Sequence, residues 1–231
     1  MSIHRKQDLV SEKSTNGMIV TSLSGPEMGD KMITVKEILL DPGSEIPVHL
    51  HPDTEETHFL IEGELTSILG DNEFTMKSRD CMMAPTGMPH GMKNNSGKVA
   101  RLLVMFPKIN PERESVENHK TTPGIPNKYV SIREDMDPYE FAPGIMRYDM
   151  VGDFTGAKSS YFCELNFNPG ASAPNHYHPH HEESMYCLEG KKSLEKGDVL
   201  FAAKKFNEAE ILFPQSIWAP KSALMAAYSY Y

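Results

Sequence analysis

From residue 18 onward, short apolar segments alternate with turn-forming residues. The apolar segments are residues 18–23, 32–40, 57–61, 65–69, 74–76, 81–84 and 99–106. Turn signals such as Asp41-Pro42-Gly43 and Gly70-Asp71-Asn72 separate them. Segments of this length, rich in β-branched residues, are typical of the strands of a sandwich or barrel. No stretch of ten or more residues has a helical period, so we predict an all-β fold.

Two polar segments mark the expected domain limits. Residues 1–17 are charged and predict a leader or an edge segment. Residues 107–128 are polar and proline-rich, which is typical of a linker between domains. Within them Pro111 can begin a short helix over 111–119. We therefore predict one domain over 18–106 and a second over 129–231.

The second domain is also predicted by an internal repeat with an offset of 127 residues. The matched positions are Pro42/Pro169, Gly43/Gly170, His49/His176, His51/His178, Pro52/Pro179, Glu56/Glu183, Gly63/Gly190, Gly70/Gly197, Asp71/Asp198 and Phe74/Phe201. So many coincidences at one offset indicate a duplicated structural unit. The two domains should therefore share one fold.

Composition narrows the class of protein and of partner. A net charge of −9 argues against nucleic acid and anionic membranes as partners, since both need a basic face. Three widely spaced cysteines, Cys81, Cys163 and Cys187, form no disulfide framework and fit a reducing compartment. The N-terminal residues have no apolar signal region, and no apolar run is long enough to span a membrane. These features favour a cytoplasmic protein with a small-molecule partner.

The candidate chemistry lies in His49-Leu50-His51 and the acidic residues after it. Residues i and i+2 of a strand point to the same face, so His49 and His51 aim at one point. Glu56 can return beside them after the turn opened by Pro52. Two imidazoles and a carboxylate suit Fe, Mn, Ni, Zn or Co. The alternative is two surface histidines beside an acidic loop, which the second copy of the pattern disfavours.

Two longer patterns resemble the paired motifs of the cupin family. The first comprises Gly43, His49, His51, Glu56 and Gly63. The second comprises Asp80, Pro85-Thr86-Gly87, His90 and Asn94, with Arg79 where the family has glycine. Because motif one recurs, the chain resembles the two-domain bicupins. The resemblance implies two tandem antiparallel jelly-roll barrels, many of which hold a metal at the centre.

Carried over to this sequence, the metal ligands of the first barrel would be His49, His51, Glu56 and His90. The resemblance selects Glu56 over Glu55, because only Glu56 is separated from Gly63 by six residues. Glu56 is also a candidate proton carrier. Alternation along the strand then turns His58 inward, as an acid–base or substrate-binding group. A histidine packed in the barrel is an equally good interpretation of His58.

Two further residues are candidates for substrate binding. Met92 shares the face of His90, where it would contribute to an apolar wall with Met82, Met83 and Met88. Arg101, in the last strand of the first domain, can bind a substrate carboxylate if it faces the barrel interior. A solvent-facing arginine is the alternative.

The second domain departs from the pattern, because no histidine follows His181. An equivalent of His90 is therefore missing, whether motif two lies at 213–219 or begins at Gly197-Asp198. The remaining candidates for a second metal are His176, His178 and Glu183; His180, His181 and Glu182 lie nearby. The alternative is that these residues are the remnant of a duplicated metal site and now contribute to packing or dimerisation. Residues 226–231 predict a last strand suited to pairing in a homodimer.

The resemblance to quercetinase-like bicupins implies a metal-dependent enzyme that acts on a small oxygenated organic molecule. A dioxygenase-type oxidoreductase with one divalent transition metal in the first domain is the leading hypothesis. An isomerase or lyase working through an enolate is an alternative on the same site. A non-catalytic bicupin that binds a small molecule is a third hypothesis.

Overall fold

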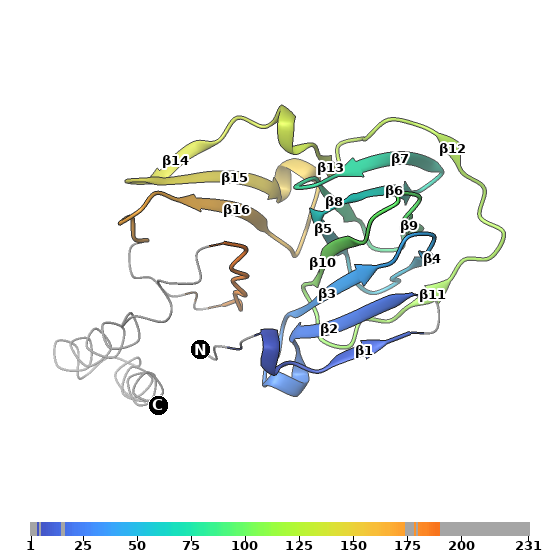
Figure 1. The fold of residues 1–231 in the computed structure, drawn as a ribbon, viewed down its shortest axis with the longest axis horizontal. Helices are drawn as coiled ribbons and strands as arrows, with labels where there is room; N and C mark the ends of the chain where they lie inside the picture. Colours follow the sequence, from blue (N-terminus) through green and yellow to red (C-terminus); the bar gives the residue numbers. More distant parts are fainter. Residues whose placement is uncertain (1–3, 5, 15–16, 174–177, 179, 190–231) are drawn as a thin grey trace. The chain divides into compact units, whose positions relative to one another are not determined.

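The computed structural model describes residues 4, 6–14, 17–173, 178 and 180–189. The chain divides into two compact units, residues 5–184 and residues 1–4 with 185–231. Residues 4 and 185–189 are the described part of the second unit. All the labelled strands of Figure 1 belong to the first unit.

The described residues are nearly all β, as the hydrophobic pattern predicts. The strands are β1 (Ser11–Lys13), β2 (Met18–Ser24), β3 (Thr34–Leu40), β4 (Glu45–Leu50), β5 (Glu56–Glu62), β6 (Glu64–Leu69), β7 (Asn72–Lys77), β8 (Cys81–Ala84), β9 (His90–Lys93), β10 (Ala100–Phe106), β11 (Glu114–Ser115), β12 (Thr122–Pro123), β13 (Val130–Ser131), β14 (Tyr139–Ala142), β15 (Ile145–Val151) and β16 (Phe162–Phe167). The helices among the described residues are short 3-10 turns: η1 (Lys6–Asp8), η2 (Pro26–Met28), η3 (Arg133–Asp135) and η4 (Asp153–Thr155). In the same part of the chain, no helix has the length and apolar character needed to cross a membrane.

Two sheets form a barrel around one hydrophobic core. The seven-stranded sheet has the order β1-β2-β3-β10-β5-β8-β13, and the six-stranded sheet has the order β11-β4-β9-β6-β7-β12. All neighbouring strands are antiparallel except β7 and the two-residue strand β12. Side chains of both sheets meet in the core, for example Leu60 and Leu102 from one and Leu65 and Met92 from the other. The predicted barrel of the first half is therefore present.

The segment after the first barrel is packed along it. β11 pairs with β4 and β12 pairs with β7, both within the predicted linker 107–128. The short helix expected over 111–119 is wrong, because Glu114 and Ser115 are drawn into an extended pair with His49 and Leu50. Pairing with a strand edge here outweighs the local preference for a helical turn.

The three-stranded sheet β14-β15-β16 repeats β1-β2-β3 at the predicted offset (Figure 1). Met18 pairs with Leu40 in the first copy, and Ile145 pairs with Phe167 in the second. The strand irregularity between Ser22 and Ser24 recurs between Asp149 and Val151. The turns η2 and η4 also correspond, at the same offset. The backbone thus repeats in register over β14–β16, while residues 190–231, including the expected last strand 226–231, lie outside the described residues.

Candidate metal centre

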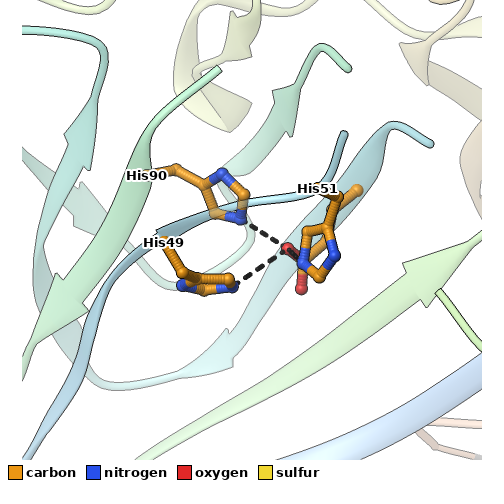
Figure 2. A group of neighbouring side chains, drawn as sticks. His49, His51 and His90 are labelled. Atoms are coloured by element: carbon orange, nitrogen blue, oxygen red, sulfur yellow. Dashed lines mark hydrogen bonds and ion pairs between the residues drawn. The ribbon is translucent and has the colours of Figure 1, made fainter. Parts of the chain in front are cut away.

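Four buried side chains converge inside the first barrel. His49 near the end of β4 lies opposite His90 at the start of β9. His51 follows β4 directly, and Glu56 begins β5 in the other sheet. All four are at most 4% exposed, and one potential ligand atom from each lies within 4.8 Å of the others. The two sheets thus contribute different ligands to one point, which Figure 2 shows for the three rings.

The local backbone explains why these residues meet. Between Ile46 and His49 the pairing of β4 with β9 is irregular, which brings β4 close to Gly91. A Cβ at Gly91 would lie 2.9 Å from the carbonyl oxygen of Ile46, so this position requires glycine. The close approach of the two backbones places the His49 and His90 rings 4.3 Å apart.

Each histidine ring is oriented by a backbone carbonyl. Nδ1 of His49 contacts the Pro47 oxygen at 2.9 Å, and Nδ1 of His90 contacts the Met88 oxygen at 2.8 Å. Nδ1 of His51 contacts the oxygen of Glu112, within the segment that follows the barrel. A carbonyl only accepts, so each Nδ1 carries the hydrogen and each Nε2 of a neutral ring presents a lone pair. This orientation is the usual one for metal-binding histidines.

The three Nε2 atoms face a single oxygen of Glu56. Their distances to Oε2 are 3.6 Å for His49, 2.9 Å for His51 and 2.5 Å for His90. Among the described residues, His51 Nε2 has no partner with hydrogen-bond geometry. Lone pairs and a carboxylate this close are stabilised by a positive charge, either ring protons or a metal ion. Ligand atoms about 2.1 Å from one ion lie about 3 Å apart, so the donor set fits a divalent transition metal.

The electrostatics of the cluster favour a metal over added protons at His49. Burial lowers the pKa of His49, although its contact with Glu56 opposes this shift. Burial would also lower the pKa of His51, but the contact with Glu56 outweighs it and the pKa is raised. Burial alone would raise the pKa of Glu56; the charge of His58 and the surrounding histidine contacts instead hold it well below its usual range. Glu56 therefore stays ionised.

His58 lies beside the cluster, as alternation predicts. His58 is 2% exposed, and its Nε2 lies 3.2 Å from Glu56 Oε1. Its Nδ1 has no hydrogen-bond partner within the described part of the chain. Met92 is buried in the hydrophobic core together with Met82. The inward placement of His58 matches the expected geometry, whereas its role and the substrate-binding role of Met92 remain predictions.

Arg101 does not face the cluster. On β10 the even-numbered residues Ala100 and Leu102 enter the core, so Arg101 points to the opposite face. There its guanidinium nitrogens Nε and Nη2 each lie 2.9 Å from Oε2 of Glu37, a carboxylate buried to 1% exposure. The expectation that Arg101 binds a substrate inside this barrel is therefore corrected. The buried negative charge of Glu37 explains why an arginine occupies position 101 on this face. The pattern of apolar residues does not reveal this partner.

Arg79 occupies the position where motif two has glycine. Its φ of 77° lies in the left-handed region, which costs an L-residue about 1–2 kcal/mol. Its Nη1 lies 3.0 Å from Glu164 on β16. The substitution thus keeps the glycine-like turn and adds an ion pair to the second copy of the repeat.

The second-half candidates form a more open group. His178 Nε2 lies 2.8 Å from Glu183 Oε2, and the rings of His178 and His181 are 4.3 Å apart. His178, His180, His181 and Glu183 are exposed. His176 lies outside the described residues. Within those residues, the cluster in the first barrel is the one group whose ligand atoms converge.

Sequence reasoning missed two contributors to the site. The Glu112 carbonyl orients His51, yet any residue can supply a carbonyl, so no sequence signal marks it. The motif spacing selects Glu56 and assigns no role to Glu55. The structure turns Glu56 to the histidines and Glu55 to the loop 158–160.

Comparisons with known proteins agree with this fold and site. Residues 36–106 match the family model of the cupin domain. The first barrel is therefore a cupin domain. The chain is 31% identical over 106 residues to a germin-like protein of Morus alba, covering 44% of this chain and 51% of that protein. It is 24% identical over an alignment of 197 residues to quercetin 2,3-dioxygenase of Bacillus subtilis, covering 66% of this chain and 58% of that protein.

A solved structure extends the likeness of fold beyond the first barrel. A variant of Bacillus subtilis oxalate decarboxylase aligns with a TM-score of 0.57 and 15% identity, covering 71% of this chain and 57% of that chain. The likeness therefore includes residues outside the cupin match, in keeping with a bicupin-like arrangement. The chain spans between half and three fifths of the length of the germin-like protein and of the quercetin 2,3-dioxygenase.

The C-terminal residues resemble a different family. Residues 179–231 match a model described as YfiO, outer membrane lipoprotein. This match overlaps the end of the predicted second domain, 129–231, and begins close to the unit boundary before Met185. The extent of the second cupin domain therefore stays a prediction.

Proposed function

We propose that this cupin is a metal-dependent enzyme acting on a small oxygenated organic molecule, and most specifically a dioxygenase-type oxidoreductase. The observation that carries the proposal is the buried set of three histidines and one glutamate, with each ring oriented through Nδ1. A divalent transition metal bound there would supply Lewis acidity toward a substrate oxygen or, if redox-active, electron transfer with O₂.

The chain's own residues would orient the substrate and manage its protons. His58 stands against Glu56 Oε1, the carboxylate oxygen opposite the one that faces the three rings. A proton taken from a substrate hydroxyl can be held at His58 Nδ1, which has no hydrogen-bond partner among the described residues. Met92 and the neighbouring apolar core exclude water, which strengthens the electrostatic interactions at the site.

The relatives favour a polyoxygenated, enolisable substrate. The quercetin 2,3-dioxygenase supports an oxygenase, and its alignment extends over both halves of this chain. A second candidate function comes from the tetracenomycin polyketide synthase protein TcmJ of Streptomyces glaucescens, 25% identical over 114 residues and covering 49% of this chain and 72% of that protein. Polyketides carry enolisable carbonyl groups, so this relative supports the alternative of an isomerase or lyase that works through an enolate. A non-catalytic binding protein is the remaining alternative.

Oxygen consumption separates these functions. Protein loaded with iron, manganese, nickel or cobalt is mixed with flavonols or β-diketones in an oxygen electrode, and products are followed by mass spectrometry. The proposal predicts O₂ uptake matched to substrate loss, abolished in Glu56→Ala. Substrate conversion without O₂ uptake would instead support the isomerase or lyase. Thermal stabilisation by these molecules without turnover under any metal would support the binding protein.

We also propose that His176, His178 and Glu183 can hold a second metal. The 2.8 Å contact of His178 with Glu183 supports this, since the pair matches His51 and Glu56 at the repeat offset. The exposure of His178 and Glu183 predicts weaker binding than in the first barrel. Metal titration of the wild type against His178→Ala tests the site: loss of a second, weaker equivalent supports it, and identical titrations contradict it.

A further inference from the structure

Glu55, next to the metal-ligand candidate Glu56, binds a loop of the second repeat. The residue is only 5% exposed. Oε1 accepts hydrogen bonds from the backbone N–H of Ser159 at 2.8 Å, the N–H of Ser160 at 2.6 Å and the Ser160 hydroxyl at 2.6 Å. Oε2 accepts from the N–H of Lys158 at 3.0 Å. Four donors on one buried carboxylate fix its position firmly.

An equivalent contact is made by a glutamate of the second repeat with a loop of the first repeat. The carboxylate of Glu182 accepts hydrogen bonds from the backbone N–H groups of Lys31, at 3.0 Å, and Met32, at 2.8 Å. Glu182 matches Glu55 at the offset of 127 residues, and the loop at 31–32 matches the loop at 158–159. In each repeat, the residue just before the glutamate of motif one therefore accepts hydrogen bonds from a loop of the other repeat. This reciprocity arises from a shared geometry rather than from a single chance contact.

Fixing Glu55 restricts the direction of Glu56. Neighbouring side chains in an extended backbone point to opposite sides. With Glu55 held by the loop 158–160, Glu56 is directed into the barrel, where Oε2 meets the three histidines. In the sequence, the loop that provides this restraint begins 103 residues after Glu55. The residue that faces the three histidines is therefore adjacent in the chain to a residue that the second repeat holds.

We propose that Glu55 is a positioning residue for Glu56 and that the second repeat, through its loop 158–160, sets the affinity and geometry of the metal site. This inference rests on the metal-dependent function proposed above. Residues that orient a ligand from outside the coordination sphere commonly change metal affinity about 10–100-fold when replaced. A purely structural Glu55 would lower thermal stability and leave the bound metal unchanged.

Cobalt(II) titration of the full chain tests the proposal, with visible absorption reporting the ligand geometry and chelator competition giving the Kd. Less than one equivalent of Co(II) is used so that the tightest site is followed. We expect Glu55→Ala to weaken binding about 10–100-fold and to change the spectrum of the bound ion. Glu55→Gln can keep the three contacts of Oε1 and should fall between Glu55→Ala and the wild type. Ser160→Ala, which removes one donor from the distant loop, should shift the Kd in the same direction.

Asp30→Ala is the matched control. Asp30 is a carboxylate that likewise accepts hydrogen bonds from a hydroxyl, that of Ser24 at 2.6 Å, and from a backbone N–H, that of Gly25 at 2.8 Å. Its replacement should lower the melting temperature without changing the Co(II) spectrum or Kd. Wild-type Kd and spectrum in Glu55→Ala or, if that variant does not fold, in both Glu55→Gln and Ser160→Ala would overturn the positioning role alone. Failure of the wild type to bind Co(II) would overturn the metal-dependent function as well.

Discussion

At the residue scale, the chemistry of the site depends on which nitrogen of each ring is available. Backbone carbonyls hold Nδ1 of His49, His51 and His90, so Nε2 is free to face Glu56. Sequence spacing could predict these ligands, because the period of a strand and the motif pattern fix which residues share a face. It could not predict the carbonyl partners or the role of Glu55, because both depend on the surrounding fold.

His58 gives the residue-scale prediction. If it moves a substrate proton, His58→Gln should keep the metal and lower kcat about 100- to 10,000-fold, since general acid–base groups contribute on that scale. Metal content and steady-state kinetics measure the two effects separately. Thr57→Val is the control, because Thr57 lies on the same strand with its side chain on the other face. An undiminished kcat in His58→Gln would show that His58 only packs the barrel.

At the element scale, Gly63 is the residue at which the chain passes from one sheet to the other. It alone separates β5 of the seven-stranded sheet from β6 of the six-stranded sheet. Its φ is 98°, and a Cβ there would lie 3.0 Å from Cα of Ala100. The glycine thus allows both a left-handed backbone and a close approach to β10. Glu56 begins β5 and Gly63 follows its last residue, so the motif spacing between them corresponds to the length of this strand.

Replacing Gly63 should cost more stability than replacing a glycine with the same backbone conformation in open space. Gly43 has a φ of 80°, and a Cβ added there would have no atom within 4 Å. We expect Gly43→Ala to lose about 1–2 kcal/mol in the free energy of unfolding, from backbone strain alone. Gly63→Ala should lose about 1–3 kcal/mol more, because the methyl group overlaps β10. Urea unfolding measures both, and equal losses would contradict the proposed close approach.

The strands themselves were predictable where the apolar runs are short and bounded by turn residues, as in β3 and β10. The helix expected over 111–119 was wrong because Glu114 and Ser115 gain backbone pairing with β4. Arg101 was misplaced for a similar reason: the sequence shows its position in a strand but not which face is occupied by a buried partner such as Glu37. Local pattern determines the element, whereas its partners come from elsewhere in the fold.

At the scale of the whole molecule, two repeats share their backbone register and hold each other through Glu55 and Glu182. Duplication was predictable from the offset of 127 residues, because turn glycines and histidines recur at equal spacing. The reciprocal contact was not, since its donors are mostly backbone N–H groups without a sequence signal. The likeness of residues 179–231 to another family adds a feature that the repeat alone did not predict.

The central claim is that the first barrel holds a transition metal through His49, His51, Glu56 and His90. Metal analysis by mass spectrometry of the purified protein, with variants prepared in parallel, tests it most directly. We predict about one tightly bound equivalent per chain in the wild type and its loss in His49→Ala and in His90→Ala. His119→Ala, a histidine whose Nε2 contacts the carbonyl of Gly70, should retain the metal. Stoichiometric metal in both His49→Ala and His90→Ala would contradict the claim.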